Sequence, residues 1–298
     1  MLRFAFSELK DKNIDAYIVF DADNIADKSF ISNMNDVLNN GYNVAQGIRE
    51  AKNPNDSWVS GSYAIYYMLS NLFINYSRYK LGTSCSINGT GFMVSKKLID
   101  KIGFNTKTLT EDIEFSSICA LKNERIYFAK NAITYDEHPD SFIVSIKQRK
   151  RWSAGTIHCM KLYSGKLLKE FFRTGNIALL DMFFVFIAPV IQILSFLNIL
   201  FIPVFRILNV SLFGFDVHLI LTGFLSSVIT YLVTTLFTII VVIMQRKKVM
   251  PLLKGILLFP LFILSWVPIH IYCFIKKQDT WDEIKHSKNM KIDEIVSE

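Results

Sequence analysis

The hydrophobic residues of this chain follow two different patterns, which change near residue 145. Before that point, short apolar runs alternate with amphipathic stretches. Residues 16–20 are uniformly apolar, which is typical of a parallel strand buried on both faces. Residues 29–40 have helical spacing, and residues 42–48 predict a second strand. The alternation predicts a mixed α/β sheet flanked by helices.

The same patterns place the remaining elements of the first half. A long aromatic-rich helical region is expected at 58–81, where core packing explains the aromatic residues better than a binding stripe does. Thr110 precedes an expected helix over 112–122. The other expected elements are a helix end at 3–12, strands at 92–94, 126–129 and 132–135, and a helix at 96–102.

The segment 145–176 is basic and amphipathic. Residues 145–173 hold eight Lys or Arg and one Glu, with large apolar side chains interleaved. This pattern predicts interfacial helices lying on a negatively charged membrane leaflet.

Three apolar stretches follow within 177–275. Those at 178–205 and 217–244 are long enough to span a bilayer. The third, 252–275, contains Pro260 and Pro268, and lysines follow it. Because positive charge favours the cytosolic side, we expect this stretch to re-enter the membrane or lie at its interface. The tail, 276–298, is then cytosolic.

Charge and cysteine content refine this picture. The net charge is +7, but the basic residues cluster beside apolar segments, which favours lipid and phosphate over nucleic acid as partners. Four scattered cysteines lack zinc-site spacing and fit a reduced compartment. We therefore expect a multi-pass protein of the cell membrane whose first 144 residues form a cytosolic catalytic domain.

Candidate chemistry begins with Asp21 and Asp23, directly after the first expected strand. Ligands bind at the carboxyl ends of such strands, and paired carboxylates there suit Mg²⁺ or Mn²⁺ with a phosphorylated substrate. Such a pair also arises by chance in surface turns. Two enzyme classes share this context: a haloacid-dehalogenase-type phosphatase and a nucleotide-sugar transferase.

Two further motifs discriminate between these classes. Glu111 and Asp112 offer a general base, although acids at a helix start are also favoured by the helix dipole alone. The segment 148–152 offers the fixed cations Arg149, Lys150 and Arg151 for a departing phosphate; juxtamembrane charge is the simpler alternative. Next to them is the indole of Trp152, which could also be an interfacial anchor. Together these motifs favour the transferase.

In this order the motifs resemble the membrane-bound, processive-type members of glycosyltransferase family 2, such as synthases of cellulose, hyaluronan and poly-N-acetylglucosamine. The resemblance runs from about residue 15 to residue 286. The matching segments are 20–24, 88–92, 109–114, 135–139, 148–152 and the tryptophan-containing 281–286.

The resemblance implies a GT-A fold, with a Rossmann-like mixed sheet, and an inverting transfer from a UDP-sugar. It implies that Asp23, assisted by Asp21, holds the divalent metal. Asp112 would deprotonate the acceptor, beside Glu111. The expected substrate-binding residues are Gly89, Thr90 and Gly91 of a glycine-bracketed turn, Gln148, Arg149 and Arg151 on the diphosphate, and Trp152 under the acceptor sugar.

The resemblance also implies what surrounds this region. Twenty residues precede Asp21, whereas the family's domain begins with further nucleotide-binding strands. We therefore expect an N-terminally truncated domain with weak activity, and an inactive remnant or membrane partner is the alternative. The acceptor is expected to be a growing polysaccharide or a glycolipid, and the donor sugar to be of N-acetylglucosamine or glucose type.

Overall fold

Five strands form one mixed sheet in the computed structural model, which describes residues 1–213, 217–276 and 292, with side chains outside 198–223. The order across the sheet is β1 (Ala16–Val19), β4 (Phe92–Ser95), β3 (Val44–Ala51), β5 (Ile126–Asp136) and β2 (Ile25–Ala26). The β3–β5 pair is parallel, whereas β1–β4, β3–β4 and β2–β5 are antiparallel. The expectation of a mixed α/β sheet is confirmed.

The expected parallel pairing of β1 is wrong. Within the described sheet β1 lies at one edge and pairs antiparallel with β4. Its uniform apolar character has another cause, because both of its faces are covered. Tyr17 packs with Phe6 of the first helix on one face, while Ile18 and Phe20 pack against the cluster around Phe30 on the other. Burial on two faces removes the polar alternation whatever the strand direction.

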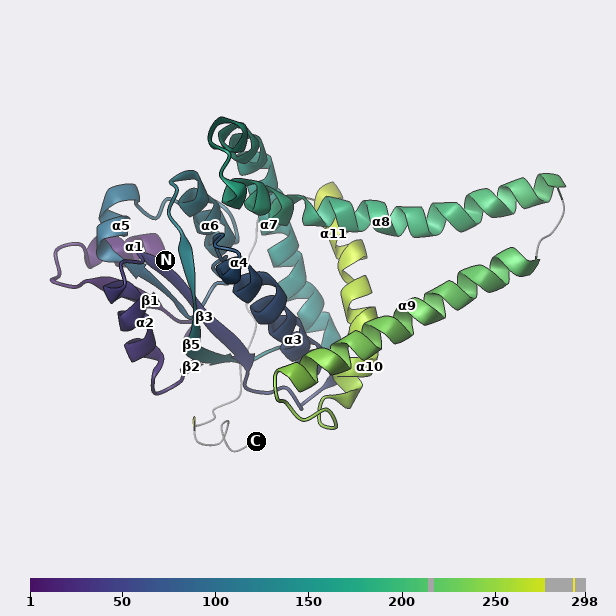
Figure 1. Ribbon diagram of the computed structural model, residues 1–298, viewed down its shortest axis with the longest axis horizontal. Helices are drawn as coiled ribbons and strands as arrows, with labels where there is room; N and C mark the ends of the chain where they lie inside the picture. Colours follow the sequence, from purple (N-terminus) through teal and green to yellow (C-terminus); the bar gives the residue numbers. More distant parts are fainter. Residues whose placement is uncertain (214–216, 277–291, 293–298) are drawn as a thin grey trace.

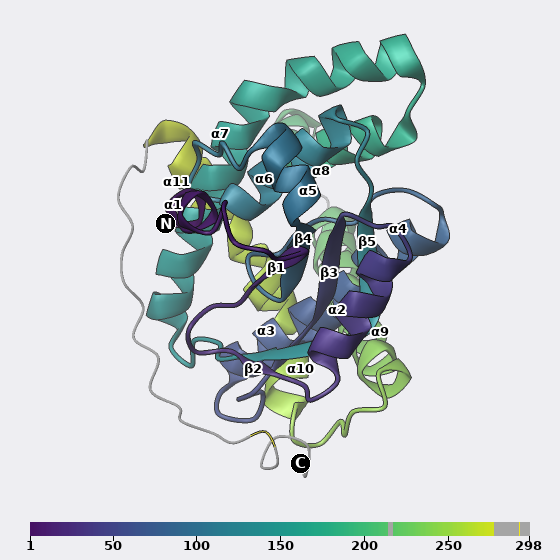
Figure 2. The same cartoon turned by 90° about the vertical axis from the view of Figure 1, so that its left-hand side faces the viewer.

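Helices cover the two faces of the sheet (Figure 2). On one face lies α2 (Phe30–Asn39), whose Phe30, Met34 and Val37 recur at helical spacing and are buried. On the other face α1 (Leu2–Glu8), α5 (Lys96–Ile102) and α6 (Glu111–Leu121) share one apolar cluster.

The aromatic-rich helical region begins at a capped residue. The Ser57 hydroxyl accepts from the backbone N–H groups of Val59 and Ser60, which satisfies the first turn of α3 (Trp58–Leu69). The helix continues through a π-helical segment η1 (Ser70–Tyr76) into α4 (Ser77–Lys80).

Most of this region's aromatic side chains are at least partly buried, as core packing predicts. Tyr63 is 0% exposed and Tyr67 is 4% exposed, whereas Phe73 is 45% exposed. Phe73 lies against Phe237 of α9 (Val217–Met244), a helix of membrane-spanning length, which accounts for its exposure.

A single strand, β5, replaces the two short strands expected at 126–129 and 132–135. Its pairing with β3 shifts register between Gly47 and Ile48, where the β5 partner jumps from Ala129 to Ile133. The polar Lys130 and Asn131 fall in this irregularity and not at a chain turn.

The basic segment forms one long helix, α7 (Phe142–Thr174), which ends at Gly175 in the left-handed conformation. One side of α7 is buried in the protein. The far end carries exposed apolar residues among its cations, including Leu162 at 37% and Phe172 at 81% exposure. The buried side of α7 and the exposed mixture of apolar and basic residues at its far end agree with the amphipathic character expected from the sequence.

The apolar segments leave the α/β part as a helical hairpin (Figure 1). The hairpin consists of α8 (Ile177–Phe213) and α9. The third apolar stretch forms α10 (Leu253–Leu264) and α11 (Trp266–Ile275). Within the described residues, three helical stretches are long and apolar enough to cross a membrane: Ile177–Leu197, Phe224–Met244 and Leu253–Ile275.

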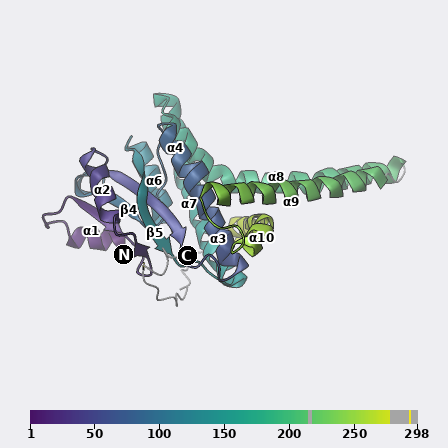
Figure 3. The ribbon, with the colours of Figure 1, turned by 60° about the horizontal axis from the view of Figure 1, so that its bottom comes forward.

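The third stretch lies crosswise to the hairpin, beside α3 and α7 (Figures 1 and 3). Gly255 of α10 packs directly on Gly61 of α3, where an added Cβ would come within 2.9 Å of the Gly61 carbonyl carbon. The interfacial placement of this stretch stays a prediction, because its length and composition would also allow it to cross a membrane. The tail motif 281–286 lies outside the described residues.

Candidate active site

The loop after β1 is fixed through its backbone, and its carboxylates stay accessible. Thr90 Oγ1 accepts from the Asp21 backbone N–H at 3.0 Å and from Asn24 Nδ2 at 2.6 Å. Lys52 Nζ donates to the Asp23 carbonyl at 2.8 Å. The Asp21 side chain is exposed and that of Asp23 is half-buried. The loop is therefore positioned by neighbours that leave its acidic groups facing outward.

A buried glutamine organises the turn at 88–91. Gln46 is 0% exposed; its Nε2 donates to the Thr90 and Gly91 carbonyls, and its Oε1 accepts from the Asn88 N–H. Gly91 has φ +62°, and a Cβ there would lie 2.6 Å from Thr134 Cγ2. Only glycine fits such a position.

The turn brings Gly89 against Asp112. Gly89 has φ +85°, and a Cβ added to it would stand 3.4 Å from Asp112 Oδ2. The first two acids of α6 therefore face the loop that holds Asp21. Glu114, one turn further on, is fully buried and accepts from the backbone N–H groups of Lys107 and Thr108, which fixes where the helix starts.

The carboxyl groups of Asp112 and Glu111 have raised pKa values. Burial raises the pKa of its carboxyl to about 7, and the adjacent Glu111 adds to the rise. Burial also raises the pKa of Glu111, which Arg151 lowers and Asp21 raises. Glu111, the neighbour of Asp112, is therefore within electrostatic reach of both Asp21 and Arg151.

A close contact with the start of α6 places α7 next to this site. A Cβ on Gly155 would lie 2.3 Å from Thr110 Oγ1, so α7 and the start of α6 are almost touching. Gln148, Arg151, Trp152 and Gly155 share one helical face. Gln148 Oε1 and Arg151 Nε are buried and have no hydrogen-bond partner among the described residues. Unpaired buried donors and acceptors of this kind are what a polar substrate would satisfy.

Arg149 has a different environment from the one we expected. It is fully buried, its Nη1 donates to the Phe262 carbonyl at 3.1 Å and to Ser265 Oγ at 2.6 Å, and its guanidinium lies 4.4 Å from the Phe262 ring centre. Neighbouring positions on a helix diverge by about 100°, so Arg149 leaves the face used by Gln148 and Arg151. These contacts indicate that Arg149 joins α7 to α10 and do not support a role on the diphosphate.

Trp152 lies in an aromatic group where α3, α7 and α11 meet. Its ring centre is 6.0 Å from that of Tyr63 and 6.2 Å from that of Trp266, the latter stacked. The indole is half-buried. Packing accounts for part of its surface, and the remainder is open to a ligand.

Sequence reasoning missed a buried ion pair beside the Asp21 loop. Arg49 of β3 donates to the Asp136 carboxylate and to the Asn88 carbonyl, and Asn24 Nδ2 donates to Asp136 at 2.8 Å. Burial raises the pKa of Asp136 to about 6, although Arg49 opposes the rise. Asp136 ends β5, and Arg49 lies two residues before the end of the parallel strand β3; the position near the carboxyl edge of the sheet was the available signal.

The segment 135–139 also has a structural role at His138. Asn53 and the His138 backbone exchange hydrogen bonds of 2.9 Å in both directions. The His138 ring stacks on Tyr67, with ring centres 5.0 Å apart. The imidazole therefore contributes to packing between β5 and α3.

The donor chemistry of this site fits a divalent cation. In the described part of the chain, no three His, Cys, Asp or Glu side chains form a protein-only metal cluster. Asp21 and Asp23 supply hard carboxylate oxygens at an accessible rim, and both act electrostatically on Asp136. Two carboxylates that leave coordination positions for phosphate and water are a pattern typical of Mg²⁺ sites. The residues therefore fit the expected metal.

The fold and this arrangement agree with a glycosyltransferase, and comparisons with known proteins point to the same class. The model of "Glycosyltransferase like family 2" matches residues 5–155, so the chain belongs to this family. The chain is also 25% identical over 247 residues to "Probable glycosyltransferase YdaM" of Bacillus subtilis (strain 168), covering 78% of this chain and 53% of that protein. The chain thus spans about half the length of this curated relative. Family membership decides against the phosphatase alternative.

Proposed function

We propose that this chain is part of a membrane-bound glycosyltransferase that moves a sugar from a UDP-sugar to a hydroxyl of a polysaccharide or lipid-linked acceptor. The observation that carries the proposal is the carboxyl group of Asp112. Its pKa is about 7, and it lies next to the Gly89 turn and to Glu111, which is within electrostatic reach of Asp21 and Arg151. Such a group can take a proton from an acceptor hydroxyl at neutral pH.

The remaining site residues are proposed to bind different parts of the sugar-nucleotide donor. Arg151 and Gln148 are proposed to donate to the leaving diphosphate, whose negative charge grows as the glycosidic bond breaks. Asp21 and Asp23 would hold Mg²⁺ or Mn²⁺, which supplies further charge stabilisation when bound. Arg49 has a positioning role, because its ion pair with Asp136 and its bond to the Asn88 carbonyl hold the loop and the turn together.

The acceptor is proposed to approach from the membrane side. Trp152 lies where α7 meets α11 and stacks on Trp266. An indole face packs well on the C–H face of a sugar ring while letting it slide. An acceptor that emerges along these helices would place its hydroxyl near Asp112, at the start of the helix that Gly155 contacts.

The test separates donor binding from transfer. UDP binding to the purified, membrane-reconstituted chain is measured by calorimetry with and without Mn²⁺, and products are followed with radiolabelled UDP-glucose and UDP-N-acetylglucosamine. Asp23→Asn is expected to remove the Mn²⁺ dependence of UDP binding. Asp100→Asn is the control and is expected to match the wild type, because the exposed Asp100 of α5 pairs with Lys96 of the same helix. Binding of UDP that is equal in all variants, or absent in the wild type, would contradict the proposal.

A further inference from the structure

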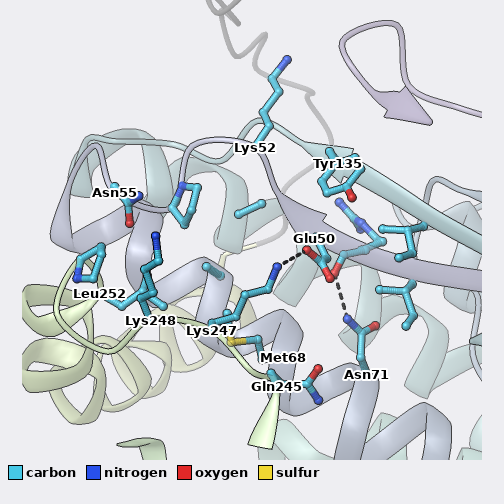
Figure 4. Close-up of a pocket in the computed structure, with 17 residues that line it drawn as sticks. Glu50, Lys52, Asn55, Met68, Asn71, Tyr135, Gln245, Lys247, Lys248 and Leu252 are labelled. Carbon is cyan, nitrogen blue, oxygen red and sulfur yellow. Dashed lines mark hydrogen bonds and ion pairs between the residues drawn. The ribbon is translucent and has the colours of Figure 1, made fainter. Parts of the chain in front are cut away.

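A cavity of about 360 Å³ lies outside the candidate active site, between β3, α3 and the loop that joins α9 to α10. Figure 4 shows its lining, with Glu50 and Asn71 on the catalytic-domain side and Lys247 and Lys248 on the loop side. The cavity shares Arg49 and Lys52 with the site described above, but none of the side chains proposed to act on the metal, the diphosphate or the acceptor lines it. Its volume falls within the range of small-ligand sites.

The cations around the cavity are not equivalent. Arg49 is paired with Asp136, and Lys52 reaches away to the Asp23 carbonyl and to Glu137 at 3.5 Å. Lys247 is paired with Glu50 at 2.7 Å across the cavity mouth.

Lys248 is exposed and has no ion-pair partner among the described residues. In Figure 4 its side chain extends towards Asn55. At the mouth of the cavity, the positive charge of Lys248 is not neutralised, whereas that of Lys247 is paired with Glu50. A net positive charge at this position favours the binding of an anion.

The interior adds an unused acceptor. Asn71 is 7% exposed, its Nδ2 donates to the Arg49 carbonyl at 2.9 Å, and its Oδ1 has no hydrogen-bond partner in the described part of the chain. A buried acceptor without a donor costs free energy unless a ligand or water supplies one. An anion that also carries hydroxyl groups would satisfy both Lys248 and Asn71.

The position of the loop identifies the source of such an anion. The loop begins where the apolar stretch Phe224–Met244 ends and finishes where Leu253–Ile275 begins. Pro251 and Leu252 line the cavity on this side, with Met68 opposite. Basic residues directly next to membrane-length helices lie at the level of lipid headgroups. The loop side of the cavity therefore lies next to membrane-length helices, and the other side is formed by β3 and α3.

We propose that this cavity binds the glycerophosphate headgroup of an anionic phospholipid. The phosphate would lie on Lys248 and Lys247, and a headgroup hydroxyl would donate to Asn71 Oδ1. The acyl chains would leave past Leu252 along α10. The proposal concerns binding alone and holds whether or not the transferase activity does.

The test uses native mass spectrometry of the full chain released from detergent with phosphatidylglycerol or phosphatidylcholine. Retention of one phosphatidylglycerol is expected, with clearly weaker retention of phosphatidylcholine. Lys248 is proposed to contact the phosphate directly, so Lys248→Glu is expected to lower retention by about fivefold or more, which corresponds to about 1 kcal/mol. Lys254→Glu is the matched control, because Lys254 is an exposed α10 lysine of the same interface outside the cavity lining, and its effect is expected to stay below about twofold.

Two results would overturn the proposal. One is equal loss of lipid in the Lys248→Glu and Lys254→Glu variants, which would indicate general surface charge. The other is displacement of the lipid by soluble glycerol phosphate, which would identify a water-soluble phosphate as the ligand. An Asn71→Leu variant provides a second probe that leaves the charge unchanged, and it is expected to weaken phosphatidylglycerol more than phosphatidylcholine.

Discussion

Gly155 of α7 and Thr110 at the start of α6 approach so closely that no side chain fits between them, since a Cβ on Gly155 would lie 2.3 Å from Thr110 Oγ1 and 2.4 Å from its methyl carbon. This contact joins the helix that carries Arg151 to the helix that carries Asp112. The distance between the proposed base and the proposed diphosphate donors therefore depends on one glycine.

Gly155→Ala is expected to separate α7 from α6. Overpacking of this kind costs on the order of 1–3 kcal/mol, more than the roughly 0.5–1 kcal/mol that alanine gains over glycine in a helix. Thermal unfolding and sugar transfer are both expected to fall. The matched control is Gly165→Ala in the same helix, because a Cβ there meets nothing within 4 Å. If Gly165→Ala lowers transfer as much as Gly155→Ala does, the contact with Thr110 is not the cause.

The two arginines of the basic motif are expected to behave differently on substitution. Arg149→Met removes donors from the Phe262 carbonyl and Ser265, and a buried group left unpaired costs about 1–3 kcal/mol, so the unfolding temperature should drop. Arg151→Met is expected to leave the unfolding temperature nearly unchanged and to weaken UDP binding. Thermal unfolding measured alongside UDP calorimetry checks both variants. The assignment fails if Arg149→Met abolishes UDP binding in a chain that remains as stable as the wild type.

Activity is expected to rise with pH through neutrality. A base must be ionised to accept a proton, and burial holds the pKa of Asp112 at about 7, so the rate should reach half its maximum near that pH. Initial rates between pH 5 and 9 measure this profile. A flat profile over this range would show that Asp112 does not control the reaction.

The ionisation of Asp112 is also expected to make the stability of the fold fall as the pH rises, which is the opposite of its expected effect on activity. Between its ordinary pKa of 3.8 and about 7, Asp112 holds its proton in the folded chain and loses it in the unfolded chain. Its contribution to stability is therefore present below pH 3.8 and is lost as the pH rises through about 7. Asp112→Asn should be more stable relative to the wild type at pH 8 than at pH 5. A difference in unfolding temperature that does not change with pH would contradict this.

The position of the third apolar stretch can be tested from its ends. If α10 and α11 lie at the interface, Lys276→Cys and Lys247→Cys should react with a membrane-impermeant thiol reagent from the same side of sealed vesicles. The native cysteines Cys85, Cys119, Cys159 and Cys273 are all buried, which keeps the background low. Labelling of the two positions from opposite sides would show that the stretch crosses the membrane.

The sequence predicted the elements of the fold better than their pairing. Helix α2 and strands β1, β3 and β4 fall close to the expected ranges because their apolar spacing is strong. The direction of β1 was wrong because an apolar run reports burial on two faces and not strand orientation. The continuity of β5 was missed because a bulge at Lys130 and Asn131 resembles a turn in sequence.

The residues proposed to act on metal or acceptor were recognisable in the sequence, and the residues that support them were less so. Asp21 follows an apolar strand, and Asp112 lies in the first turn of a helix, and both positions can be recognised in the sequence. Gln46 and Arg49 act through backbone carbonyls of the 88–91 turn, and nothing in their sequence neighbourhood reveals those partners. Arg149 was grouped with Arg151 by adjacency, whereas the 100° step between neighbouring helical residues directs it to α10.

The rate of sugar transfer by Asp112→Asn tests the central claim most directly. Asparagine keeps the size of the side chain but cannot accept the acceptor's proton, and a positioned base contributes ~10²–10⁴-fold to the rate. Transfer from radiolabelled UDP-sugar should fall by about that factor, while Mn²⁺-dependent UDP binding remains close to that of the wild type. Transfer at the wild-type rate by Asp112→Asn would contradict the account.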